Sequence, residues 1–306
     1  MVDVLIIGLG RISFSLTRNK TICKSSHIGT LLSNKKYNLI GAVDKSISKI
    51  NYVKRHVKTK FFTNIKEALK KLKPNLIVIA VSTDNHLKII SYLKKINFIC
   101  KVILIEKPLG RNFFEAKKII NILKSRNIKI FVNYSRAYEP KFGSIKKIFN
   151  NKENIGFVLY SGDFLNNASH FISLFVHFFG KVRKIKLLNY KKKNKNINID
   201  CILYFKKCIL YIFNFKKRKT HIFLLKDRNK ILFCHNLLNK IHILNNNKKK
   251  IINTNLQTQN NVYDEIYKYI NNRKFIISST SDALYVHKII RIIIKKNKDV
   301  NKFQKV

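Results

Sequence analysis

The first ten residues of the chain constrain its fold more than any other segment. An apolar run from Val4 to Ile7 leads into Gly8 and Gly10, and a second apolar run ends on an acid, Asp44. Glycine tolerates positive φ and has no side chain to hold a ligand away. A strand, paired glycines, a helix and a strand-ending acid are typical of the opening of a dinucleotide-binding fold. The segment therefore predicts a nicotinamide site.

The glycine motif departs from its common form in two ways. Ser13 stands at the third glycine position, and Asp44 follows after more than the usual ~20 residues. We expect the polar segment from Thr17 to Ser26 to supply the extra length as a loop over the cofactor cleft. The alternative is that Gly8 and Gly10 only make a tight turn.

Short apolar runs alternate with segments of helical period through the first half of the chain. Such strands are buried on both faces, so we expect a Rossmann-type, doubly wound parallel sheet over residues 1–133. After about residue 145 strand-like runs follow one another with short polar turns. We expect residues 134–306 to form an α+β domain with an open, mainly antiparallel sheet. The predicted strands of the first domain are 4–7, 39–43, 76–81, 102–105 and 128–132.

The chain is strongly basic, with 63 Lys and Arg against 15 Asp and Glu, a formal net charge of +48. Such charge ordinarily indicates a nucleic acid or an anionic membrane as partner. Here the lysines are spread along the whole chain, with no base-stacking motif. We expect only non-specific affinity for polyanions at low salt, and no specific nucleic-acid partner.

The remaining composition predicts a cytoplasmic protein. The five cysteines have no CxxC spacing, which indicates free thiols in a reducing compartment and no metal site. The N-terminal apolar run is short and contains Asp3, unlike a signal peptide. No apolar segment reaches the ~18 residues of a membrane helix.

Polar side chains follow two further predicted strands. Ser82 and His86 follow one of them, where Thr83 or Asp84 would also serve as a helix N-cap. After the next strand come Glu106 and Lys107, which are costly at a buried strand end unless they are used. A desolvated lysine near other cations would have a lowered pKa and could pass a proton at neutral pH. An ordinary turn with a solvated lysine is the alternative.

Five motifs in order resemble the glucose-fructose oxidoreductase and inositol dehydrogenase (Gfo/Idh/MocA) family. They are residues 6–13, residues 42–44, residues 106–109, residues 132–140 and the segment 166–174 followed by residues 178–180. The resemblance implies a hydride transfer between NAD, less readily NADP, and a hydroxyl- or ketone-bearing carbon of a sugar, sugar nucleotide or cyclitol. It also implies a homo-oligomer that forms through the open sheet. His27 after a longer opening loop resembles a sugar-modifying branch.

The same resemblance assigns roles to individual residues. Lys107 would be the proton donor or acceptor, and His170 its partner at the substrate oxygen. Asn166 and Tyr134 would contact a polyhydroxylated substrate. The cofactor would be held by Gly8, Gly10, Ile12, Asp44, Ser82, His86 and Glu106.

The sequence departs from the family pattern on the helix of His170. Asn166 stands where the family often has an aspartate, and Ser173 replaces a frequent acid. An amide hydrogen-bonds hydroxyls but cannot shuttle protons. Two alternatives therefore stay open: a cofactor-binding homologue with lost or narrowed catalysis, and a core role for His170 beside Phe171 and Phe175.

Overall fold

The computed structural model describes residues 1–306 except 97, 150–152, 194–195, 216–220, 236–239, 246–247, 255–258, 276–279 and 296–301. The chain forms two compact units. The first comprises Met1–Ser135 and Thr258–Thr280, and the second comprises Arg136–Gln257 and Ser281–Val306. We expected every residue after 133 in one domain, whereas the segment 258–280 belongs to the first unit, because its helix packs there.

The first unit is built on a six-stranded parallel sheet in the order β3-β2-β1-β4-β5-β6. The order reverses between β1 and β4, as in a doubly wound fold, which confirms the predicted fold class. The strands are β1 (Val2–Ile7), β2 (Tyr37–Val43), β3 (Lys60–Phe62), β4 (Leu76–Ile79), β5 (Val102–Ile105) and β6 (Lys129–Val132). The helices are α1 (His27–Leu32), α2 (Ile47–Lys54), α3 (Ile65–Lys71), α4 (Thr83–Lys95), α5 (Phe113–Lys124) and α8 (Asn260–Ile270).

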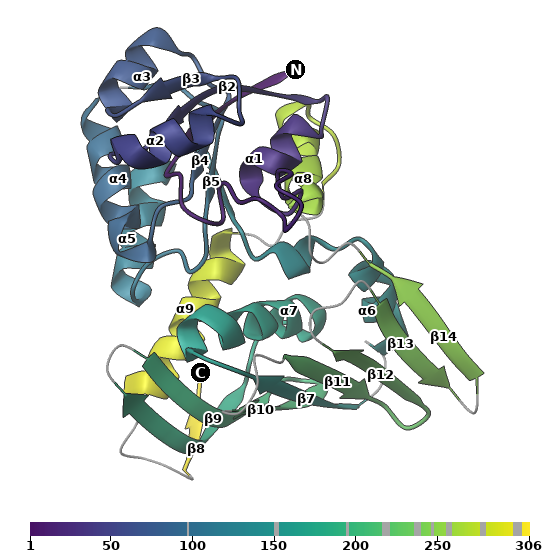
Figure 1. Ribbon diagram of the computed structural model, residues 1–306. Helices are drawn as coiled ribbons and strands as arrows, with labels where there is room; N and C mark the ends of the chain where they lie inside the picture. The colour runs from purple at the N-terminus through teal and green to yellow at the C-terminus, as the bar shows by residue number, and fades with distance from the viewer. Residues whose placement is uncertain are drawn as a thin grey trace. The chain divides into compact units, whose positions relative to one another are not determined.

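The helix that usually follows the glycine motif is displaced in this chain. Residues 10–14 form a single turn, in which Gly10 accepts hydrogen bonds from the backbone N–H groups of Ser13 and Phe14. The chain then runs irregularly to α1, which begins only at His27 with Ser26 as its N-cap. In Figure 1, α1 lies beside α8, a helix that the chain reaches more than 200 residues later.

The second unit is built on a nine-stranded sheet in the order β14-β13-β12-β11-β7-β10-β9-β8-β15. β7 and β10 pair in parallel, and the other recorded pairs are antiparallel, which confirms a mainly antiparallel sheet. The strands are β7 (Asn154–Tyr160), β8 (Lys184–Lys193), β9 (Asn196–Tyr204), β10 (Cys208–Asn214), β11 (Ile222–Lys226), β12 (Lys230–His235), β13 (Lys240–Asn245), β14 (Lys248–Asn253) and β15 (Phe303–Lys305). The helices are the 3-10 helix η1 (Ser135–Tyr138), α6 (Lys141–Phe149), the π-helix η2 (Phe164–Ala168), α7 (Ser169–Phe179) and α9 (Thr280–Lys295).

Helix α7 covers one face of the nine-stranded sheet (Figure 1). Phe171 and Phe175 are fully buried and pack their rings near Phe223 of β11. A Cβ at Gly156 of β7 would lie 2.6 Å from the Phe175 ring, so glycine is needed for this close approach. Aromatic burial of this kind is the main stabilising term of such a layer.

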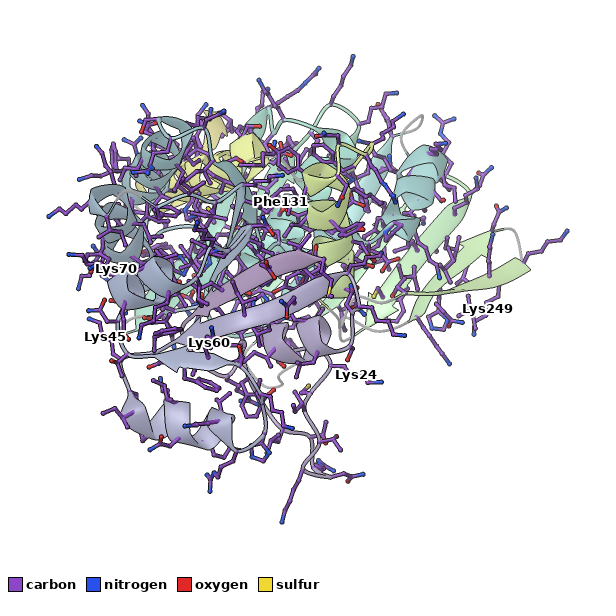
Figure 2. The ribbon with its side chains drawn as sticks, turned by 90° about the horizontal axis from the view of Figure 1, so that it is seen from above. Lys24, Lys45, Lys60, Lys70, Phe131 and Lys249 are labelled. Carbon is purple, nitrogen blue, oxygen red and sulfur yellow. The ribbon has the colours of Figure 1, made fainter. Side chains whose placement is uncertain are left out.

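Lysine side chains project from the surfaces of both units. Figure 2 shows Lys60 of β3, Lys70 of α3 and Lys249 of β14 each extending from its own element. Among the described residues, no helix combines the length and the apolar character that a membrane span requires.

Candidate functional site

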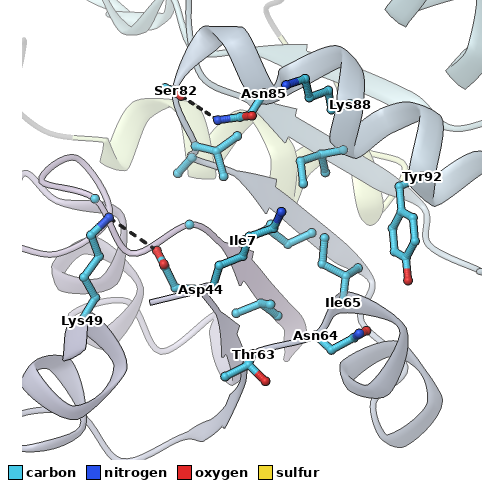
Figure 3. A pocket seen from close by; sticks show the side chains of 17 residues that line it. Ile7, Asp44, Lys49, Thr63, Asn64, Ile65, Ser82, Asn85, Lys88 and Tyr92 are labelled. Atoms are coloured by element: carbon cyan, nitrogen blue, oxygen red, sulfur yellow. Dashed lines mark hydrogen bonds and ion pairs between the residues drawn. The ribbon is translucent and has the colours of Figure 1, made fainter. Parts of the chain in front are cut away.

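A cavity of about 720 Å³ opens at the carboxyl ends of β1, β2 and β4 in the first unit. It lies at the point where the strand order reverses, which is where open α/β sheets bind ligands. Gly8, Gly10, Asp44 and Ser82 all line it, so the structure brings these four predicted residues together. Helix α4 adds Lys88 and other side chains to the wall (Figure 3).

Gly8 occupies a position that no other residue fits well. Its φ is +101°, and an added Cβ would lie 2.8 Å from the backbone oxygen of Ala80. Ser13, at the third glycine position, is fully buried, and its hydroxyl donates to the Gly8 carbonyl oxygen at 2.5 Å. The serine therefore holds the glycine turn together by a hydrogen bond where a glycine would only allow close packing.

Asp44 is held by two backbone groups at the edge of the cavity. One carboxylate oxygen accepts a hydrogen bond from Leu9 N–H at 2.7 Å and the other accepts one from Ser46 N–H at 2.9 Å. The ammonium of Lys49 faces the carboxylate at 3.9 Å (Figure 3). A carboxylate fixed in this way points its remaining lone pairs toward the cavity, where a ribose diol can donate to them.

The acid at the end of β5 has a different environment. Glu106 is buried, and His27, which is fully buried, lies 2.8 Å from its Oε1 through Nε2. Asn133 of the β6 end donates to the same oxygen and also to Gln259, the residue before α8. Nδ1 of His27 lies 2.8 Å from the hydroxyl of Tyr263. Glu106 does not line the cavity.

Two pKa shifts fix the charge state of this cluster. Burial raises the pKa of the Glu106 carboxyl, but hydrogen bonds from His27 and Asn133 and electrostatic attraction to His27 and Lys107 outweigh burial and leave it below its ordinary value. Burial raises the pKa of the Tyr263 hydroxyl far above its ordinary value. The carboxylate is therefore ionised at neutral pH, and the phenol keeps its proton.

Lys107 is half-buried, and its backbone N–H donates to Oε2 of Glu106 at 3.2 Å. The Glu106 carboxylate also attracts the charge of Lys107. His86 is fully buried outside the cavity wall, with its ring nitrogens 3.2 Å from the Leu109 oxygen and 3.1 Å from the Val81 oxygen. Burial lowers the pKa of His86, so its ring is neutral and donates a hydrogen bond to one of these two oxygens.

The N-cap of α4 also differs from expectation. The helix begins at Thr83 with Ser82 as its N-cap residue, so neither Thr83 nor Asp84 has that role. The Ser82 hydroxyl accepts a hydrogen bond from the Asn85 amide at 2.9 Å, which places both side chains at the cavity edge.

In the second unit, His170 is half-buried while its neighbours Phe171 and Phe175 are fully buried. The π-helix η2 leads directly into α7 and carries Asn166, which is exposed. Single π-helical turns are frequent at functional sites. The nearby carboxylate of Asp163 accepts hydrogen bonds from the backbone N–H groups of Asn166 and Ile197.

The other predicted residues lie apart from the cavity wall. Ile12 is 40% exposed on the turn after the glycines, and Tyr134 is buried. The loop from Thr17 to Ser26 contributes no residue to the wall. The wall residues that we did not predict include Lys49, Asn64 and Tyr92, which come from three different helices or their caps and share no sequence motif.

Residues 2–134 match the model of an oxidoreductase family with an NAD-binding Rossmann fold. This part of the chain is therefore similar to the Gfo/Idh/MocA family. A curated relative, Oxidoreductase P35 of Formosa agariphila, is 26% identical in an alignment 165 positions long that covers 45% of this chain. The match spans about half (50%) of the length of that relative.

Solved structures resemble the whole chain. A dehydrogenase (MviM) from Clostridium difficile superimposes with a TM-score of 0.78 at 16% identity, over 96% of this chain and 99% of that one. An oxidoreductase from Agrobacterium radiobacter, solved in complex with NAD⁺, L-tartaric acid and magnesium, gives a TM-score of 0.77 at 10% identity, over 99% and 98%. At these identities the likeness shows that both units of the chain share the fold of these proteins.

The first unit has the features that a dinucleotide requires. A Cβ at Gly8 would fill the space next to β4, and the cavity beyond it is bounded by one fixed carboxylate, Asp44. Backbone close to a diphosphate and a carboxylate close to a ribose are the two contacts that define this site class. Within the described residues, no group of three or more His, Cys, Asp or Glu side chains is arranged to hold a metal ion.

Proposed function

We propose that the chain is an oxidoreductase that transfers a hydride between a nicotinamide cofactor and a hydroxyl- or ketone-bearing carbon of a sugar, sugar nucleotide or cyclitol. The observation that carries the proposal is the cavity at the strand reversal, with Gly8 in a conformation reserved for glycine and Asp44 at its edge. The family of residues 2–134 and the NAD⁺ bound by the Agrobacterium protein support it.

The cofactor we assign is NAD rather than NADP. Gly8 and Gly10 would face the diphosphate, with Ile12 on the same turn, and Asp44 would accept hydrogen bonds from the ribose diol. The fixed Asp44 carboxylate would repel a 2′-phosphate, whereas Lys45 and Lys49 at the same edge weaken that repulsion. When bound, the nicotinamide ring supplies or accepts the hydride.

We assign the proton transfer to Lys107 and His170. Oxidation of an alcohol releases a proton from the hydroxyl, and Lys107 is the amine at the strand end where this family of folds binds its ligands. His170 would share the proton at the substrate oxygen. Asn166 and Tyr134 would hydrogen-bond neighbouring hydroxyls, so the substrate would be polyhydroxylated.

Lys107→Met tests this assignment. We expect kcat to fall by about 10²–10⁴-fold while cofactor affinity stays the same, because general acid-base catalysis acts in the chemical step. The assay follows nicotinamide absorbance with a panel of aldoses, uronic acids, sugar nucleotides and cyclitols. A variant with the turnover of the wild type would show that Lys107 is a turn residue.

A second candidate function is a cofactor-binding homologue with little catalysis. It is favoured by Asn166 at the position of the common acid and by Asp163, whose carboxylate already accepts two backbone hydrogen bonds. The same panel separates the two candidates. Saturable NADH binding without turnover on any member of the panel, and turnover gained by Asn166→Asp, would support the second.

We also propose that the chain pairs with a second copy through the face of the nine-stranded sheet opposite α7. On β7, Ile155 and Phe157 are 45% and 41% exposed, and the Phe157 ring stacks on Tyr211 at 5.0 Å. Exposed apolar groups of this kind mark interaction surfaces. Light scattering should report an oligomer, and a monomer would contradict the proposal. For the scattered lysines we propose only non-specific polyanion binding.

A further inference from the structure

A cluster of buried polar side chains lies next to Lys107, and the proposed function does not use it. It consists of Glu106, His27, Asn133, Gln259 and Tyr263 and is called the Glu106 cluster below. Its members come from distant parts of the chain: α1, the ends of β5 and β6, and the start of α8. Figure 1 shows α1 and α8 side by side, which is how His27 and Tyr263 meet.

The hydrogen bonds of the cluster have one consistent direction. An ionised carboxylate can only accept, so Nε2 of His27 carries the proton that is donated to Glu106. Nδ1 of the same ring shares a hydrogen bond with the Tyr263 hydroxyl, the two atoms lying 2.8 Å apart. The other carboxylate oxygen accepts from the Lys107 backbone N–H. The Glu106 carboxylate thus joins the backbone of Lys107 to α1 and α8.

Stability alone does not explain this arrangement. Desolvating a carboxylate costs several kcal/mol, and well-packed apolar residues often replace buried charged groups at no loss. The same charge has an effect on Lys107, because the attraction that lowers the pKa of the Glu106 carboxyl stabilises the Lys107 ammonium by the same free energy. The buried Glu106 charge therefore affects the protonation of the proposed proton donor, Lys107.

We propose that Glu106 and His27 are positioning residues that set the protonation of the Lys107 amine and fix its backbone. The proposal rests on the proposed function only for its catalytic consequence. The titratable groups recorded around Glu106 are His27 on α1, Tyr263 on α8, Lys107 on its own loop and His86 on α4. Lys107 and His27 are both attracted to the Glu106 carboxylate and should both respond when it changes, whereas His86 and Tyr263 keep the same charge at neutral pH; labelling reports the response of Lys107.

Competitive acetylation of Lys107 tests the proposal without a substrate. The whole chain is labelled with trace acetic anhydride at increasing pH, and the label is read by mass spectrometry on peptides that contain Lys107. In Glu106→Gln we expect the midpoint of labelling to fall by about one pH unit, because the neighbouring negative charge is gone. The plateau at alkaline pH reports access to the amine and should stay unchanged.

His27 is tested by a pair of variants. His27→Phe removes the donor to Glu106, so more of the carboxyl is protonated and Lys107 should label faster at neutral pH than in the wild type. His27→Gln retains an N–H donor and should restore the labelling rate. Glu67→Gln is the matched control: it removes a surface carboxylate that pairs with Lys71 at 2.9 Å and should leave Lys107 unchanged.

Several outcomes would overturn the proposal. An unchanged midpoint in folded Glu106→Gln would do so, and so would an equal shift in Glu67→Gln. If His27→Phe does not fold by circular dichroism, Glu106→Gln, which preserves size, decides alone. If the labelling midpoint shifts but the protein oxidises no member of the panel, the proposed function is rejected and the positioning role stands. If the protein turns over a substrate but the midpoint does not shift, the positioning role is rejected and the proposed function stands.

Discussion

The buried polar groups of the two units differ in how they are satisfied. In the first unit, both ring nitrogens of His27 and both carboxylate oxygens of Glu106 have partners. In the second unit, Nη1 of Arg136 and Nε2 of His287 are buried without a hydrogen-bond partner among the described residues. Three further atoms of the second unit are buried without a hydrogen-bond partner among the described residues: the hydroxyls of Ser169 and Ser173 and Oδ2 of Asp227. In the first unit the same is true of Oδ1 of Asn133.

This difference teaches how to interpret a buried charge or ring. Where partners from distant segments converge on a buried polar group, as around Glu106, the fold satisfies the hydrogen bonds of that group, and this indicates a functional role. Where the partner is missing, the group costs free energy and its replacement should help. Burial of Arg136 lowers the pKa of its guanidinium to about 9, and the recorded neighbour of the guanidinium is the Phe171 ring at 4.4 Å.

The largest expected effect contrasts two glycines. Gly8→Ala should lower the free energy of unfolding by about 4 kcal/mol, because positive φ and close packing each cost about 1–3 kcal/mol. A Cβ added at Gly143 of α6 would meet no atom of the described residues within 4 Å, so Gly143→Ala should raise stability by about 0.5–1 kcal/mol. Urea unfolding measures the stability of both variants. Equal changes in the two variants would show that the chain is no more tightly packed at Gly8 than at Gly143.

His287→Leu should stabilise the chain at acid pH. Burial lowers the pKa of His287 to about 4. As pH falls from about 6.5 to about 4, the unfolded chain binds a proton that the folded chain does not, so about 3 kcal/mol of stability is lost. The variant should lose this part of the pH dependence, whereas the exposed His56→Leu should keep it. The measurement is the free energy of unfolding at neutral and at acid pH. If this free energy falls with pH equally in His287→Leu and in the wild type, the buried His287 does not cause the loss of stability.

A smaller and opposite effect is expected from Tyr263→Phe. The change removes the hydroxyl that satisfies the buried Nδ1 of His27 and should cost about 1–2 kcal/mol. Tyr267→Phe on the same helix is the control, since no hydrogen bond of its hydroxyl is recorded among the described residues, and it should change stability by less than about 0.5 kcal/mol. If Tyr263→Phe were as stable as the wild type, the hydrogen bond between Tyr263 and His27 would not contribute to stability.

The sequence was enough to predict the parts of the site that depend on local pattern. Gly8, Gly10 and Asp44 meet at one sheet edge because parallel strands end together. The role of Glu106 could not be predicted, because its partner His27 lies 79 residues away and Tyr263 lies 236 residues from His27. Strand β3 was not among the predicted strands for a different reason: it is three residues long, which is too short to show an alternating pattern.

The most direct test of the account is a titration of the whole chain with NADH and NADPH, followed by nicotinamide fluorescence. We expect saturable binding of both, with NADH bound at least about tenfold more tightly, because that ratio corresponds to about 1.4 kcal/mol of repulsion at Asp44. Asp44→Asn should remove the preference. Failure of either nucleotide to saturate the protein, or tighter NADPH binding that Asp44→Asn does not change, would contradict the cofactor site on which the account depends.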